Sequence, residues 1–270
     1  EDLNVELEAP AGGGRRIDIE AGFTVIETKR DLRKGSVREE AEVQLAGYVR
    51  DRAKTLGQRY VGILTDGADW RLYHVGTDDA LHEVSSFELS PTAPDVERLS
   101  VWLEGALATA EAIQPTPREI ERRLGAQSSA HALDAAELAA LYAANKDHPT
   151  VRLKRELWAR LLRTAFGTGF EDDARLFVEH TLLVGTAEII AHAVVGLDPA
   201  TLAPATVLSG QRFAHAGISG VVEEDFFDWI IEVPGGESFV RTLSRRLMRF
   251  SWNDVEHDVM KVLYESVISA

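Results

Sequence analysis

The stretch that decides the fold is RRIDIEAGFTVIETKRD, residues 15–31. Its two strand-like runs, RRIDIE and FTVIETKR, are joined by an Ala-Gly turn, which is the pattern of a β-hairpin. Residues two apart in a strand project from the same face. We therefore expect Glu27 and Lys29 to project together, with Thr28 pointing away. Such a pair is either a solvated hairpin end or part of a metal site.

The segments that follow predict an α/β core. SVREEAEVQLAGYVRDRAKT, residues 36–55, has helical apolar spacing, and Ser36 with Glu39 forms a possible capping box. RYVGILTDG, DWRLYHV and LHEVSSFEL are predicted strands, and a helix over residues 95–113 is expected to pack on their sheet. The predicted fold class is thus α/β, with a mixed sheet flanked by helices.

After Pro117 the sequence becomes rich in Ala and Leu at helical spacing, which predicts an all-α region. The expected helices cover residues 117–125, 130–145, 150–166, 170–195, 236–250 and 253–269. We therefore predict two domains, an α/β domain over residues 1–114 and a helical domain over residues 115–270.

The composition is that of a soluble globular protein, with 45% hydrophobic and 27% charged residues among 270. No apolar run approaches the roughly 18 residues of a membrane span, so no membrane partner is expected. The chain has no cysteine, which excludes disulfides and thiolate metal sites and fits a cytoplasmic location.

The net charge of −15 argues against a nucleic-acid partner at first sight. The charge is unevenly distributed, however. Residues 1–75 contain 12 Lys/Arg and 14 Asp/Glu, a net of −2, which leaves −13 for the rest. Acids that bind a cation would lower the effective negative charge of the first part further.

Asp18, Glu27 and Lys29 together suggest phosphodiester hydrolysis. Mg²⁺ held by two carboxylates neutralises phosphate charge and lowers the pKa of a bound water, and a nearby Lys can orient that water. Asp18 on one strand and Glu27 on the next can converge across the hairpin. The D…ExK pattern alone is weak, because many strands contain it by chance.

The surrounding motifs strengthen this interpretation. Gln44 and Tyr48 lie four residues apart on the predicted helix and share one face, and VGILTDGADWRLY follows. The series Asp18, IETK, QLAGY and LTDGADWRLY resembles the PD-(D/E)xK nuclease domain at the amino end of type I and type IIG restriction enzymes. The resemblance covers about residues 5–75 and implies a restriction-endonuclease-like core that cleaves double-stranded DNA.

The resemblance also implies a role for each matching residue. Asp18 and Glu27 would be Mg²⁺ ligands, with Mn²⁺ able to substitute, and the carbonyl of Thr28 would be a further metal ligand. Lys29 would be the water-positioning catalytic base. Gln44 would be the family's glutamine beside the active centre, with Tyr48 as its helix partner.

The sequence departs from the family pattern at two points. Ile17 stands where the motif name has Pro. Many members add an acid from an upstream helix, and Glu1, Glu6 and Glu8 are the candidates here, although VELEA is typical of a strand.

The helical part resembles the connector that joins nuclease to amino-methyltransferase in type IIG enzymes, in the segments LSGQRFAHAGISGVVEEDFFDWI and VMKVLYESVIS. The implied partners are an adjoining or separate adenine-type methyltransferase and a target recognition domain. FGTGF, residues 166–170, follows a helix and is interpreted as a helix end rather than a cofactor loop, so no organic cofactor is expected.

Several alternatives stay open at this point. GGGRR, residues 12–16, is a flexible turn or a backbone approach to phosphate. The basic faces at residues 152–163 and at Arg241, Arg245 and Arg249 are solvated, bind DNA or contact an acidic neighbouring domain. The expected function is a Mg²⁺-dependent endonuclease of a restriction-modification or phage-defence enzyme. The alternatives are a degenerate nuclease fold that binds DNA or acts as a scaffold, and a nuclease that acts only when a partner delivers DNA.

Overall fold

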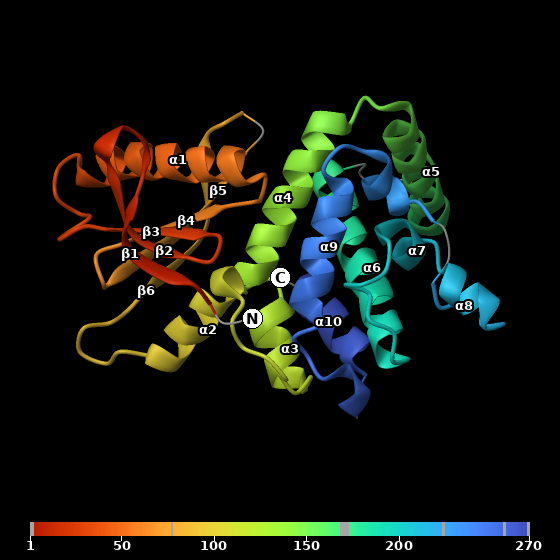
Figure 1. The fold of residues 1–270 in the computed structure, drawn as a ribbon. Helices are drawn as coiled ribbons and strands as arrows, with labels where there is room; N and C mark the ends of the chain where they lie inside the picture. Colours follow the sequence, from red (N-terminus) through yellow and green to blue (C-terminus); the bar gives the residue numbers. More distant parts are fainter. Residues whose placement is uncertain (1–2, 77, 168–172, 223–224, 256–257, 269–270) are drawn as a thin grey trace. The chain divides into compact units, whose positions relative to one another are not determined.

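The structure is a computed structural model that describes residues 3–76, 78–167, 173–222, 225–255 and 258–268. The chain divides into two compact units (Figure 1). One consists of Glu1–Ala110 with Arg122–Ala136, and the other of Glu111–Glu121 with Glu137–Ala270. The predicted division into domains at residue 114 stays a prediction.

The first unit is built on a six-stranded sheet whose spatial order is the chain order, β1-β2-β3-β4-β5-β6. All neighbouring strands are antiparallel except β3 and β4, which are parallel. This mixed sheet agrees with the predicted α/β core, and the helices after it agree with the predicted helical region. The strands are β1 Val5–Pro10, β2 Arg16–Ala21, β3 Thr24–Thr28, β4 Val61–Thr65, β5 Asp69–Val75 and β6 Leu81–Glu88.

The parallel pair exists because helix α1, Val37–Leu56, carries the chain from the end of β3 back to the start of β4. The helix ends at Gly57, whose φ of 62° is left-handed and whose N–H donates to the Ala53 carbonyl. The predicted capping box is wrong, because the Ser36 hydroxyl makes no bond to the backbone and instead bonds the carboxylate of Glu40.

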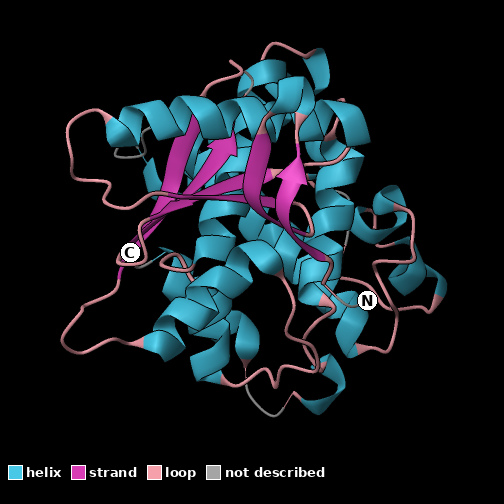
Figure 2. Cartoon of the chain, turned by 60° about the vertical axis from the view of Figure 1, so that its left-hand side comes forward, coloured by secondary structure: helices cyan, strands magenta, loops and turns pink. Residues whose placement is uncertain are grey.

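The two faces of the sheet are covered by different helices. Val25 packs in the core under α1, while its neighbour Ile26 packs in the core that includes helix α2, Val96–Leu107. Figure 2 shows the twisted sheet with helices against it. The predicted packing of the 95–113 helix is confirmed, since Trp102 Nε1 donates to Ser85 Oγ at 2.8 Å, but the helix ends at Leu107.

The described residues of the second unit form helices joined by loops, with an isolated β-bridge between Ile113 and Phe250, and helices α3 and α4 each contribute residues to both units. The predicted helix 236–250 ends earlier, at Leu247, and the predicted helix 253–269 begins later, at Val259. Two short helices, α7 and α8, were not predicted. The helical elements are α3 Pro117–Leu124, α4 Ser129–Asn145, α5 Pro149–Phe166, α6 Ala174–Val194, α7 Pro204–Leu208, α8 Gln211–His215, η3 Asp228–Glu232, α9 Gly236–Leu247, η4 Trp252–Asp254 and α10 Val259–Ile268, with η1 Gly12–Gly14 in the first unit.

Helix α6 is the centre of the helical core. Its Phe177 stacks on Trp229, whose ring nitrogen donates to the Thr181 hydroxyl at 3.1 Å. By length and composition this is the one helix of the described chain that could cross a membrane. Its buried side chains, such as Ile189 and Ile190, instead face other helices of the unit.

His74 on β5 gives the fold a predicted pH dependence. It is 9% exposed and neither ring nitrogen has a hydrogen-bond partner among the described residues. Burial first, then the positive charge of Arg59 and the neighbouring His82, lower the pKa of His74 from 6.5 to about 4. The unfolded chain therefore takes up a proton that the folded chain excludes between these two pH values.

We predict that the free energy of unfolding is fully retained above pH 6.5 and falls by about 3 kcal/mol as the pH drops to about 4. His74→Gln should remove this part of the pH dependence in urea titrations. His82→Gln, at the directly paired and exposed position on β6, is the matched control and should keep most of it, because burial is the largest cause of the His74 shift and His82 the smallest. An unchanged pH profile in His74→Gln would contradict the prediction.

Candidate active site

The predicted acids lie on neighbouring strands, at the point where β2 and β3 stop pairing. The antiparallel ladder ends at Ile19 and Ile26, so Asp18 and Glu27 occupy the next positions. There the Asp18 carboxylate, and not a backbone carbonyl of β2, accepts the hydrogen bond of the Thr28 N–H on β3. Its Oδ2 accepts from the Thr28 N–H and from the Thr28 hydroxyl, both at 2.8 Å. One oxygen of Asp18 is thus fixed against β3.

Glu27 is a buried carboxylate of which only one oxygen has a hydrogen-bond partner among the described residues. It is 1% exposed, its Oε1 accepts from the Lys29 ammonium, and its Oε2 has no partner among the described residues. Burial raises the pKa of Glu27, Lys29 opposes this shift, and the negative charges of Asp18 and Glu8 add to it. The site therefore holds a costly charge that a cation would stabilise.

These two acids fit a divalent cation. A buried polar atom without a partner calls for an explanation such as an ion, and Oε2 of Glu27 is such an atom. Oδ1 of Asp18 is likewise without a hydrogen bond within the described chain. No group of three or more His, Cys, Asp or Glu placed to hold a metal occurs in the part of the chain that the structure describes. A two-carboxylate site would leave most positions of a Mg²⁺ octahedron to water.

The loop that follows β3 is held in place by the turn between β4 and β5. The Lys29 N–H donates to the Thr65 carbonyl at 2.9 Å and extends the parallel ladder past the end of β3. Asp66 accepts from the Leu32 N–H at 3.0 Å and from two N–H groups of its own turn. Burial alone would raise the pKa of Asp66, but these backbone donors outweigh it and lower the pKa. The predicted Thr-Asp-Gly turn thus anchors the loop after Lys29.

Gln44 supports the site indirectly. Its side-chain amide donates to the Tyr48 hydroxyl at 3.0 Å, and that hydroxyl donates to the Arg16 carbonyl at 2.8 Å. No hydrogen bond joins Gln44 to the three predicted catalytic side chains within the described residues. The pair on α1 therefore holds the backbone two residues before Asp18.

Of the two upstream candidates that the structure describes, Glu6 and Glu8, it is Glu8 whose charge acts on Glu27; Glu1 lies outside the described residues. Glu8 is part of β1, as VELEA predicted, and lies between the paired positions Leu7↔Ile19 and Ala9↔Ile17. Its φ of 53° is left-handed, which costs a non-glycine residue on the order of 1–3 kcal/mol. The sequence offered Glu8 only as one of three candidates, because no residue type signals a left-handed glutamate in a strand.

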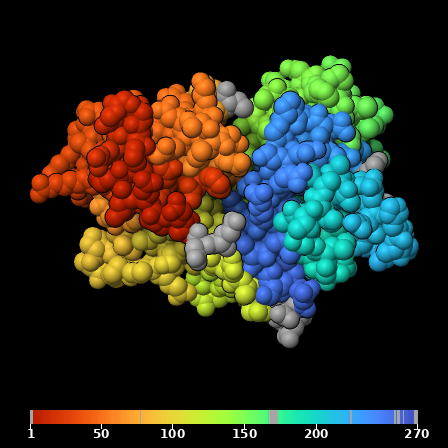
Figure 3. Space-filling view, viewed as in Figure 1, coloured from red at the N-terminus to blue at the C-terminus, as the bar shows by residue number. Residues whose placement is uncertain are grey.

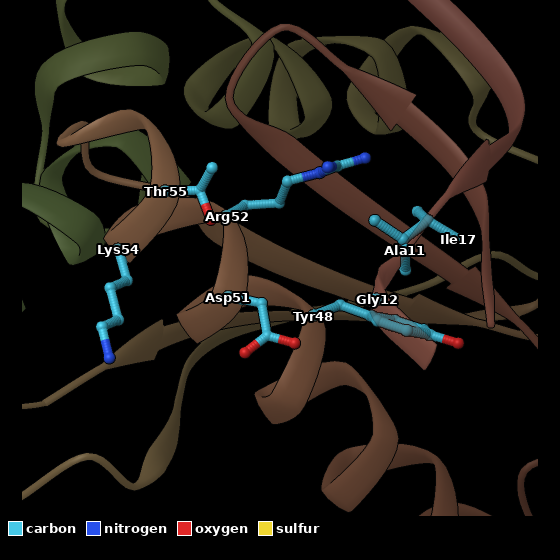
Figure 4. Close-up of a pocket in the computed structure, with 8 residues that line it drawn as sticks. All are labelled: Ala11, Gly12, Ile17, Tyr48, Asp51, Arg52, Lys54 and Thr55. Carbon is cyan, nitrogen blue, oxygen red and sulfur yellow. The ribbon is translucent and has the colours of Figure 1, made fainter. Parts of the chain in front are cut away.

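A cavity of about 220 Å³ lies between the turn after β1 and helix α1 (Figure 4). Its lining includes Ile17, which precedes Asp18, and Tyr48, which bonds the Arg16 carbonyl. It does not include Asp18, Glu27 or Lys29. The lining residues are Ala11, Gly12, Ile17, Tyr48, Asp51, Arg52, Lys54 and Thr55. The predicted chemistry therefore does not belong to this cavity.

Comparison with known proteins identifies no relative, since no protein-family model, no curated protein and no solved structure matches the chain.

We predict that Mg²⁺ or Mn²⁺ raises the melting temperature of the protein through Asp18 and Glu27. At a metal concentration ten times the dissociation constant the stabilisation is about 1.4 kcal/mol. Asp18→Asn and Glu27→Gln should each lose it, and Glu39→Gln, an exposed glutamate on α1, should keep it. Differential scanning calorimetry with and without metal makes the test, and an equal shift in Glu27→Gln would sink the assignment.

Proposed function

We propose that the chain is a Mg²⁺-dependent DNA endonuclease module, part of a restriction-modification or related phage-defence enzyme. The observation that supports this most is the buried carboxylate of Glu27, which contacts Lys29 and leaves one oxygen without a partner. A purely structural ion pair gains little from such an arrangement, because burying a charge without satisfying it is destabilising.

The residues of the site divide the work of hydrolysis between them. Thr28 fixes one oxygen of Asp18, so the other oxygen has a defined direction. Lys29 donates to Glu27 and is about a quarter exposed, which leaves its remaining N–H groups for a water or a phosphate oxygen. Lys29 would hold the attacking water and stabilise the charge that develops on the phosphate.

Asp18 and Glu27 would hold the metal ion, with the Thr28 carbonyl as a further proposed ligand. Bound Mg²⁺ would neutralise phosphate charge and make its water more acidic. Both tasks need a site of fixed geometry, and the bonds of Asp18 to Thr28 and of Asp66 to the loop after β3 provide one.

The substrate, partners and location that we propose are based on the sequence motifs and not on the geometry of the site. The IETK, QLAGY and LTDGADWRLY segments resemble nuclease domains whose enzymes also contain an adenine-type methyltransferase and a target recognition domain. We therefore propose double-stranded DNA as substrate, those two modules as adjoining or separate partners, and the cytoplasm as location. The helical unit would be a connector without chemistry of its own.

We predict that the wild-type chain nicks supercoiled plasmid slowly in Mg²⁺ or Mn²⁺ and yields no discrete fragments. Lys29→Met should slow nicking by about 10²–10⁴-fold, the usual contribution of a general base. Lys261→Met removes an exposed lysine on α10 and should nick at the wild-type rate. Agarose-gel time courses measure both.

The same assay separates the proposal from a degenerate nuclease fold. A wild-type chain that binds duplex DNA but never nicks it with either metal would be a DNA-binding or scaffolding module. Nicking that survives in Lys29→Met would place the activity elsewhere or in a contaminant. Circular dichroism spectra of each variant show whether a loss of activity reflects unfolding.

A further inference from the structure

Two basic segments adjoin the candidate active site. Residues 11–16, AGGGRR, lead into β2, and residues 29–36, KRDLRKGS, leave β3. Together they contain six Lys/Arg and one acid, within a chain whose net charge is −15. Both fall in the red-to-orange part of the chain, which forms outer surface of the first unit (Figure 3). The local positive charge is therefore concentrated in sequence around the site.

Topology places these segments next to each other, beyond the Asp18–Thr28 contact. Because β2 and β3 are antiparallel, the start of β2 and the end of β3 lie at the same end of the hairpin. Arg16 precedes Asp18 by two residues, and Arg30 follows Thr28 by two. The two arginines thus lie on neighbouring chain segments, each two residues beyond the point where the carboxylate of one strand bonds the backbone of the other at 2.8 Å.

The basic side chains of these segments differ in whether they already have an ion-pair or hydrogen-bond partner within the protein. Arg15 bonds the Gly12 carbonyl and reaches Asp51 at 3.5 Å, and Arg33 pairs with Asp31 at 3.1 Å. Lys34 is also 3.9 Å from Asp31. Arg16 and Arg30 differ from all of these.

Arg16 and Arg30 are both exposed, and neither has an ion pair or a side-chain hydrogen bond within the described chain. A guanidinium without an internal partner keeps all five donors for a ligand. Its planar fork matches the oxygens of a phosphate and forms charge-assisted bonds with them. The chemistry that complements these two positions is therefore a phosphodiester backbone.

We infer that Arg16 and Arg30 each bind a backbone phosphate of duplex DNA, next to the bond that the proposed site cuts. The inference rests on the proposed function for the identity of that bond. It assigns a phosphate contact to the side chain of the second arginine of GGGRR, whereas the sequence alternative was an approach of the backbone to phosphate. It also explains how an acidic chain engages a polyanion, since a local patch of charge steers a charged ligand even when the net charge is unfavourable.

The basic line of helix α9 is the competing surface and supplies the control. Arg241 is 44% exposed and lies 3.9 Å from Glu237, which partly offsets its charge. Arg245 is exposed on the same helix. Neither is near the candidate acids in sequence or belongs to the sheet-containing unit. Changing this pair alters the net charge by the same amount as changing Arg16 and Arg30.

The test is fluorescence anisotropy with the full chain and a labelled duplex of arbitrary sequence, in chelator so that no cleavage occurs. Arg16→Gln and Arg30→Gln should each weaken binding by about tenfold at low salt, and the double variant by about a hundredfold. Each lost phosphate contact also lowers the slope of log affinity against log salt by about 0.9. The double variant Arg241→Gln/Arg245→Gln should bind as wild type does, with an unchanged slope.

Two results would overturn the inference: wild-type binding that is undetectable at low salt, or a larger loss in the α9 variant than in Arg16→Gln/Arg30→Gln. Plasmid nicking keeps the two proposals apart. If Lys29→Met abolishes nicking while the arginine variants bind and nick as wild type does, the proposed function stands and this inference fails. If the arginines control binding but no variant nicks, the inference stands as DNA binding and the proposed function fails.

Discussion

The rest of the structure depends on the burial of one carboxylate, Glu27, at the point where β2 and β3 separate. An ionised carboxylate in such a place is unfavourable unless it is paired and hydrogen-bonded. Lys29 supplies one partner, and the second oxygen is left without one among the described residues. Asp18 and Glu8 add negative charge to the same region and raise the pKa of Glu27 further. These charges at the end of the hairpin therefore lower the stability of the fold, as is common at functional sites.

The surrounding elements hold this unfavourable arrangement in place. On one side, α1 covers the sheet and its Tyr48 bonds the backbone just before Asp18. On the other side of the site, Asp66 bonds the loop that follows Lys29. The backbone is thus fixed on both sides of the point where the strands separate. A rigid scaffold of this kind is what a site of precise geometry requires.

Much of this could be predicted from the sequence, because hydrophobic period and turn residues decide strands and long helices. The hairpin, α1 and the mixed sheet followed from residues 15–75. Other features could not be predicted, since they depend on tertiary contacts. Ser36 bonds a side chain instead of capping α1, and Glu8 adopts a left-handed φ. The bond of Gln44 to Tyr48, in contrast, agrees with the prediction that the two residues share one face of the helix. The short helices α7 and α8 have too few residues for a periodic signal.

The most direct measurement is a ¹³C NMR titration of the Glu27 carboxyl, assigned with Glu27→Gln, in the presence and absence of Mg²⁺. The account predicts that Glu27 in the metal-free protein has a pKa above the ordinary value of a glutamate. Saturating Mg²⁺ should lower that pKa sharply in the wild type and leave the pKa of Asp18→Asn where it is without metal. A Glu27 that titrates at the ordinary value of a glutamate, or whose pKa does not respond to Mg²⁺ in the wild type, would contradict the account.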